Sequence, residues 1–140
     1  MKPFFTWVER NNTIGIFLLR LFIGLWLIYG VQDNIASWSR LLEFRDFLEN
    51  FGFPLPLLSA GISIVAQFVA GIMIVLGWRI RYAAILMLFN FAVAMMVHLH
   101  GSIEEMIPAL TMFFCSLLFL FQGAGKISID SSKKYNNEVI

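Results

Sequence analysis

Residues Leu57 to Gly77 read LLSAGISIVAQFVAGIMIVLG, a run that contains no charged side chain. A helix rises about 1.5 Å per residue, so a run of this length crosses the roughly 30 Å hydrocarbon core of a bilayer. A membrane-spanning strand is shorter and alternates apolar with polar residues. This stretch therefore predicts a helix that spans a membrane.

Three more apolar blocks of comparable length lie at residues 14–31, 81–97 and 103–122. Of the 140 residues, 59% are hydrophobic and only 14% are charged, a balance that excludes an ordinary soluble domain. In lipid, every backbone N–H and C=O must be satisfied within its segment, which leaves the helix for such continuous runs. We predict an all-α fold, a four-helix transmembrane bundle in one domain over residues 1–130, with a flexible polar tail at 131–140.

The longest gap between spans, residues 32–56, has a pattern of its own. From Ser37 to Leu48, apolar and charged side chains recur at approximately helical spacing, which predicts a short amphipathic helix on the outer membrane surface. The following Phe51 to Pro56 segment contains a glycine and two prolines, so the chain turns there into the second span.

Basic residues are distributed unevenly between the two sides of the predicted bundle. Seven lie on the side of the termini, namely Lys2, Arg10, Arg79, Arg81, Lys126, Lys133 and Lys134. The opposite side holds Arg40 and Arg45, and Arg20 lies inside the first span. Because Lys and Arg collect in cytoplasmic loops, we predict that both termini are cytoplasmic. The lipid bilayer is the expected partner, and no nucleic acid is expected.

Three polar side chains, Arg20, Gln67 and Asn90, lie well inside the predicted spans. A charged group such as Arg20 is costly in hydrocarbon, so it is a functional candidate by default. Gln67 and Asn90 belong to stripes of small and polar residues that should face the bundle interior. The three side chains can converge on one buried site, where Arg20 can bind a quinone carbonyl or an anionic group. The alternative is that they hydrogen-bond one another and only hold the helices together.

A second polar group lies between the third and fourth spans, where His98 and His100 precede Glu104 and Glu105. Imidazoles and carboxylates bind metals and relay protons, but this spacing is not specific for a metal site. The two acids also suit the positive start of the fourth helix, and we favour this capping role. The single cysteine, Cys115, excludes an internal disulfide and is interpreted as a packing residue.

Several segments, taken in order, resemble the DoxX family of bacterial membrane proteins. They are Leu18-Leu19-Arg20-Leu21 with Gly24, Phe51-Gly52-Phe53-Pro54-Leu55-Pro56, Gln67 with Gly71, Leu76-Gly77-Trp78-Arg79, Met96-Val97-His98, and Phe121-Gln122-Gly123-Ala124-Gly125-Lys126-Ile127-Ser128-Ile129-Asp130. The most distinctive elements are the closing Gly-x-Gly-x-x-Ser-x-Asp and the Leu-Gly-x-x-x-Arg that follows the second span. The resemblance covers nearly the whole chain.

The resemblance implies a four-helix protein of the bacterial inner membrane. Some members of the family are related to the small subunit of a thiosulfate:quinone oxidoreductase, and others to redox or oxidative-stress assemblies. Arg20 and His98 match the family pattern. The family commonly has Glu at the position of Gln67, and a His-Gly pair followed by Lys where this chain has Tyr29-Gly30 and then Asp33.

From these observations we expect a membrane subunit that supports quinone-linked electron transfer. The sequence identifies no cofactor, and a quinone is one candidate. The candidate ligand-binding residues are Arg20, Gln67, Asn90 and His98, with no catalytic residue identified and no metal expected. A noncatalytic anchor or assembly factor for a partner protein is the alternative, and a homo-oligomer is compatible with either. A transporter is less favoured because no inverted repeat is visible among four helices. Whether the chain forms part of an enzyme is left open by the sequence.

Overall fold

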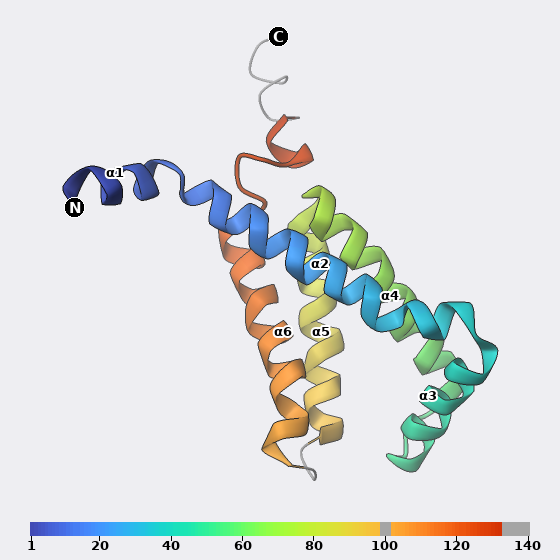
Figure 1. Cartoon of the computed structure of the whole chain (residues 1–140). Helices are drawn as coiled ribbons and strands as arrows, with labels where there is room; N and C mark the ends of the chain where they lie inside the picture. The colour runs from blue at the N-terminus through green and yellow to red at the C-terminus, as the bar shows by residue number, and fades with distance from the viewer. Residues whose placement is uncertain (99–101, 133–140) are drawn as a thin grey trace.

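The computed structural model describes residues 1–98 and 102–132, and every regular element in these ranges is helical. The named helices are α1 (Lys2–Arg10), α2 (Asn12–Ala36), α3 (Trp38–Asn50), α4 (Pro56–Leu76), α5 (Ile80–Val97) and α6 (Ile103–Gln122) (Figure 1). Helices α2, α4, α5 and α6 are long and apolar enough to cross a membrane. The predicted all-α fold with four spans is therefore confirmed, and the first span extends beyond the predicted 14–31 at both ends.

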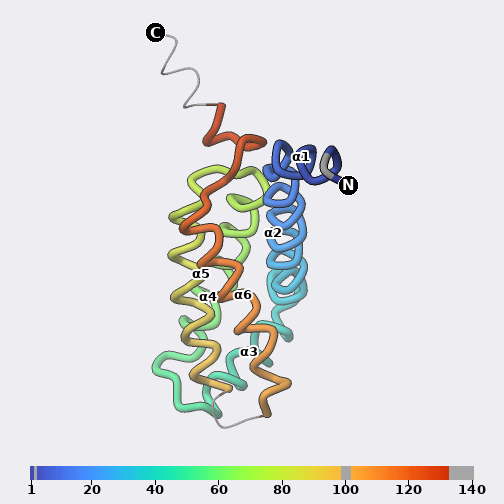
Figure 2. The backbone as a smooth tube through the Cα atoms, turned by 90° about the vertical axis from the view of Figure 1, so that its left-hand side faces the viewer, coloured from blue at the N-terminus to red at the C-terminus, as the bar shows by residue number. Residues whose placement is uncertain are grey.

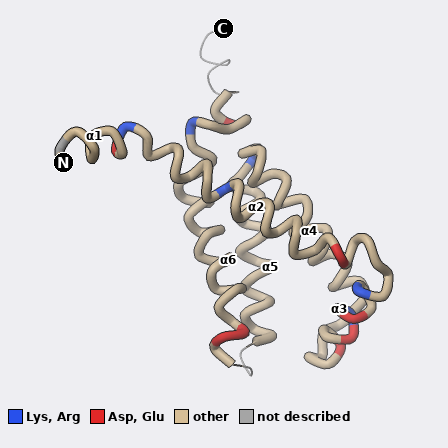
Figure 3. Tube along the Cα trace, in the orientation of Figure 1, with Lys and Arg blue, Asp and Glu red and all other residues tan. Residues whose placement is uncertain are grey.

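The four long helices form a bundle with two distinct ends. The closely packed pairs are α2 with α4, α4 with α5, and α5 with α6. One end carries α1, the α4–α5 turn and the segment after α6, and we call it the terminal end (Figures 1 and 2). The opposite end, called the far end, carries α3 and the start of α6. Charged residues gather at these two ends, while one positive segment lies within α2 (Figure 3).

Small residues let α2 and α4 approach closely. A Cβ atom added to Gly24 would lie 2.7 Å from the Gly71 carbonyl oxygen, and one added to Gly71 would lie 2.9 Å from that of Gly24. Close backbone contact of this kind is the usual way in which helices associate in lipid, where burial of apolar side chains gives little driving force. The main core continues from this crossing into α5 and α6, where Met87 and Phe119 are fully buried.

Helix α3 follows α2 after a single extended residue, Ser37, with φ −132° and ψ 120°. It packs against α2 and α4 at the far end, with Leu48 buried. Its position on the outer membrane surface stays a prediction, as does the cytoplasmic location of the termini.

Helix α1 was not expected from the sequence, because nine residues give too short a pattern to stand out from the long span that follows. Its start fits Pro3, since proline is favoured in the first helical turn. Asn11 separates α1 from α2 with non-helical dihedral angles, φ −112° and ψ 23°.

Candidate functional site

The guanidinium group of Arg20 lies at the terminal end, and the residue is only 1% exposed. Its Nε donates to the carbonyl oxygen of Ile74 at 3.0 Å, and its Nη2 donates to that of Val75 at 3.0 Å. Its Nη1 donates to the carbonyl oxygens of Ala124 at 2.6 Å and Ile127 at 2.7 Å. The side chain thus joins three segments of the backbone through four hydrogen bonds.

These acceptors explain why a charged group is stable at this position. Ile74 and Val75 belong to the last turn of α4, where carbonyl oxygens lack the usual partner four residues later, although the Gly77 N–H also donates to the Ile74 carbonyl oxygen at 3.2 Å. A positive charge is also favourable at the negative end of a helix dipole. Ala124 and Ile127 lie in the segment after α6, so Arg20 fastens this segment to α2 and α4.

Asp130 accepts hydrogen bonds from backbone N–H groups at the start of α5, as Arg20 donates to carbonyl groups at the end of α4. Its Oδ1 accepts from the backbone N–H of Arg79 at 2.8 Å, and its Oδ2 accepts from that of Ile80 at 3.2 Å. The N-cap residue Arg79 adopts a left-handed conformation with φ 47° and makes no side-chain cap of its own. A carboxylate from a distant part of the chain therefore caps α5, and its charge also acts on the nearby Arg20.

The turn between α4 and α5 requires glycine at position 77. Gly77 has φ 63°, and a Cβ there would collide with the Arg20 guanidinium and would lie 2.6 Å from the Ser128 Cβ. Its carbonyl oxygen accepts from the backbone N–H of Asp130 at 3.1 Å. We call this arrangement of Arg20, Gly77, Asp130 and their backbone partners the terminal clamp.

The other two intramembrane candidates form a separate hydrogen-bonded chain. Gln67 Nε2 donates to Ser63 Oγ at 3.1 Å, and Ser63 Oγ donates to Asn90 Oδ1 at 2.8 Å, which links α4 to α5. Arg20 is not part of this chain, because its donors are directed to the terminal end, about 10 Å along α4 from Gln67. The expectation that Arg20 converges with Gln67 and Asn90 on one site is therefore wrong.

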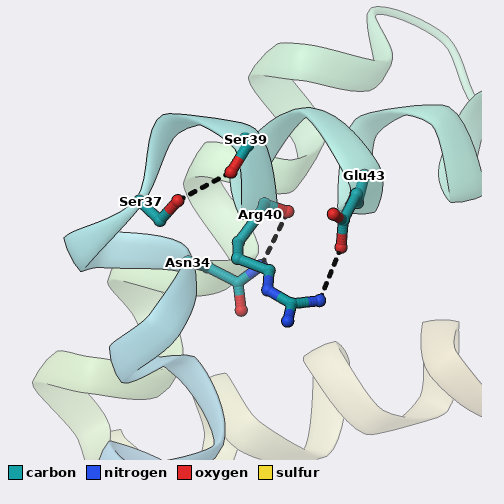
Figure 4. Close-up of polar contacts among 5 residues, drawn as sticks. All are labelled: Asn34, Ser37, Ser39, Arg40 and Glu43. Atoms are coloured by element: carbon teal, nitrogen blue, oxygen red, sulfur yellow. Dashed lines mark hydrogen bonds and ion pairs between the residues drawn. The ribbon is translucent and has the colours of Figure 1, made fainter.

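A polar pocket of about 510 Å³ lies toward the far end, between α2, α3 and α4. Its lining residues are Gly30, Val31, Asp33, Asn34, Arg40, Glu43, Phe44, Ile64 and Gln67. Arg40 Nη1 pairs with Glu43 Oε2 at 2.8 Å, and Asn34 Nδ2 donates to the Arg40 carbonyl oxygen at 3.1 Å (Figure 4). Gln67 is the sequence candidate that lines this far-end pocket. Two of the three positions noted as departures from the family pattern, Asp33 and Gln67, meet here, whereas Tyr29 is not among the lining residues.

Comparison with known proteins gives the same family as the motifs. The DoxX family profile matches residues 15–100, which is more than half of the chain and includes Arg20, Gln67, Asn90 and His98. The chain belongs to the DoxX family. No curated protein and no solved structure matches it. The C-terminal half of the terminal clamp lies beyond the matched residues.

His98 is the C-cap residue of α5 in this DoxX protein, and it is not among the residues that line the far-end pocket. Its Nδ1 lies 3.9 Å from Glu105 Oε2, and its ring centroid lies 6.0 Å from that of Phe47. The Ser102 hydroxyl accepts from the Glu105 N–H at 3.4 Å, and both acids occupy the first turn of α6, which agrees with a capping role. His100 lies outside the described residues. Among the residues that the structure describes, no cluster of His, Cys, Asp and Glu is arranged to hold a metal ion.

Sequence reasoning missed two parts of this site. Asp130 was noted within a motif, but its capping of α5 has no local sequence signal because it acts across 51 residues. Arg40 and Glu43 were assigned to an amphipathic helix on the membrane surface, and Asp33 was noted as a departure from the family pattern. The packing of α3 against α2 and α4 brings these three charged residues beside Gln67.

Proposed function

We propose that this DoxX protein is an inner-membrane subunit that supports quinone-linked electron transfer and binds a quinone headgroup in the far-end pocket. The observation that carries the proposal is the polar lining of this pocket, which combines an amide, an ion pair and a further carboxylate. Its volume of about 510 Å³ is within the usual range for small-molecule sites.

The amide of Gln67 suits a ligand that changes between quinone and quinol. One N–H of Gln67 is used by Ser63, which leaves the second N–H and the carbonyl oxygen for a ligand. The N–H can donate to a quinone carbonyl, and the oxygen can accept from a quinol hydroxyl. Gln67 can serve both redox states without changing its own protonation.

The rim of the pocket carries carboxylates that can accept the protons released when a quinol is oxidised. Oxidation of a quinol releases two electrons and two protons. Asp33 and Glu43 are exposed carboxylates beside the pocket and can pass protons to water. The electrons pass to a redox partner protein, which the proposal requires.

A noncatalytic anchor is the second candidate, and the terminal clamp favours it. Arg20, the residue most suggestive of ligand binding in the sequence, bonds to four backbone carbonyl groups of its own chain. A charge that is satisfied in this way requires no ligand. The anchor hypothesis predicts a partner protein in fixed stoichiometry and no bound quinone.

Quinone binding in nanodiscs tests the proposal. We expect a short-chain quinone to bind the wild type, and we expect Gln67→Leu to weaken this binding about tenfold. A hydrogen bond between neutral groups contributes about 1 kcal/mol, and the leucine also leaves the quinone carbonyl without a donor. The matched control is Gln122→Leu, at an exposed amide on the opposite end of the bundle. Equal binding by both variants contradicts the proposal. A stoichiometric protein partner without copurified quinone supports the anchor.

A further inference from the structure

Helix α1 has two chemically different faces. One face carries large apolar side chains that are all exposed, Phe4 at 61%, Phe5 at 58%, Trp7 at 58% and Val8 at 43%. Successive helical residues are about 100° apart, so these four side chains share an arc of about 160°. Thr6, Glu9 and Arg10 lie on the opposite side of the helix. Such a division is typical of helices that lie at a boundary between apolar and aqueous surroundings.

The apolar face of α1 is not covered by the bundle. Within the described part of the chain, none of the closely packed helix pairs includes α1. Figures 1 and 2 show α1 leaving the terminal end and running away from the bundle, across the direction of α5 and α6. The apolar face therefore needs an occupant from outside the bundle.

The place of α1 identifies this occupant. Asn11 alone separates α1 from α2, and Asn11 fixes the change of direction through bonds from its backbone N–H and its Nδ2 to the Trp7 carbonyl oxygen, at 3.1 and 2.8 Å. Helix α2 is a candidate span, so α1 lies at the level where that span leaves the hydrocarbon. Aromatic side chains concentrate at this depth in membrane proteins, and Arg10 on the polar face suits the phosphates of lipid headgroups.

We infer that α1 is an in-plane helix whose occupant is the phospholipid interface of the membrane that the bundle spans. The four apolar side chains insert among the upper acyl chains, while Glu9 and Arg10 face water and headgroups. This contact holds the start of α2 at a fixed depth. The inference does not depend on the proposed quinone site.

Spin labels on the intact protein test this arrangement. Val8→Cys and Glu9→Cys, each in a Cys115→Ala background, are labelled and reconstituted in vesicles of phosphatidylcholine and phosphatidylglycerol. We expect oxygen, which concentrates in lipid, to relax the label at position 8 several-fold more than a water-soluble nickel chelate does. The label at position 9, the matched control on the polar face, should show the reverse preference.

Two results overturn the inference. If both labels are relaxed mainly by the nickel chelate, α1 lies in water. If the label at position 8 is shielded from both reagents and shows spin–spin broadening that dilution with unlabelled protein removes, a second copy covers the face instead. An independent measurement uses the fluorescence of the unlabelled protein, in which the contribution of Trp7 is the difference between the wild type and Trp7→Phe. Lipids brominated near the headgroup should quench this contribution, and absence of the quenching also contradicts lipid contact.

Discussion

Replacement of Arg20 by leucine should separate membrane insertion from folding. Leucine is about 3 kcal/mol easier to insert at a helix centre than arginine, so the amount of inserted protein should not fall. The variant nevertheless removes the donors of four hydrogen bonds to backbone carbonyl groups. At about 0.6 kcal/mol for an average interhelical bond in a bilayer and about 1.5 kcal/mol for a bond to a charged group, the free energy of unfolding should fall by about 2 to 6 kcal/mol.

Equilibrium unfolding in bicelles, followed by circular dichroism, measures this loss. Arg10→Leu is the matched control, because Arg10 is exposed on α1 and outside the bundle, and its effect should stay below about 0.5 kcal/mol. Arg20→Lys should fall between the two, since lysine keeps the charge but offers three donors from a single point.

A local readout distinguishes loss of the terminal clamp from general destabilisation. Ala124 is buried, and its carbonyl oxygen is one of the acceptors of Arg20. A cysteine at position 124, in a Cys115→Ala background, should react slowly with a maleimide in the wild type and quickly in Arg20→Leu under native conditions. The reasoning is refuted if Arg20→Leu unfolds within about 0.5 kcal/mol of the wild type and leaves position 124 protected.

Other perturbations follow from the same contacts. Asp130→Ala should lower the free energy of unfolding by about 1 kcal/mol, the usual value of an N-cap, with Asp130→Asn closer to wild type in the same assay. Gly24→Leu should cost about 1 to 3 kcal/mol or prevent folding, because its side chain would meet the α4 backbone, and a cross-linking pair between α2 and α4 would report the loss. Gln67→Glu and Arg20→Leu should have additive effects on stability, since the two side chains belong to separate networks, and a coupling energy above about 0.5 kcal/mol would contradict this. Cysteines introduced in α3 should react with an impermeant reagent in intact cells and those after residue 130 should not, if the termini are cytoplasmic.

The spans could be predicted because length and composition alone determine whether a helix can cross a bilayer. The stripes on α4 and α5 also placed Gln67 and Asn90 on faces that meet, and Ser63 bridges them. Arg20 was recognisable as a charge that needed partners. The hydrogen-bond partners of Arg20 could not be predicted from the sequence, because every residue has a backbone carbonyl group and no sequence pattern distinguishes the four that bind Arg20.

Two features depend on how the chain folds back on itself. The far-end pocket exists because α3 packs against α2 and α4, which brings Arg40 and Glu43 close to Gln67. The capping of α5 depends on a segment 51 residues later, whose motif was visible but whose target was not. Sequence spacing predicts contacts within a helix well, and it predicts contacts between distant segments poorly.

The terminal clamp also imposes an order on biosynthesis. The first two acceptors of Arg20 belong to α4, but the other two are 104 and 107 residues further along the chain than Arg20 itself. Chains emerge from the ribosome from the N-terminus onward, so α2 and α4 can pair in the bilayer while half of these hydrogen bonds are still missing. Only when the segment after α6 has been made does the guanidinium obtain its complete set of acceptors. An interrupted chain therefore keeps a partly unsatisfied cation at the membrane boundary, which distinguishes it chemically from a finished one.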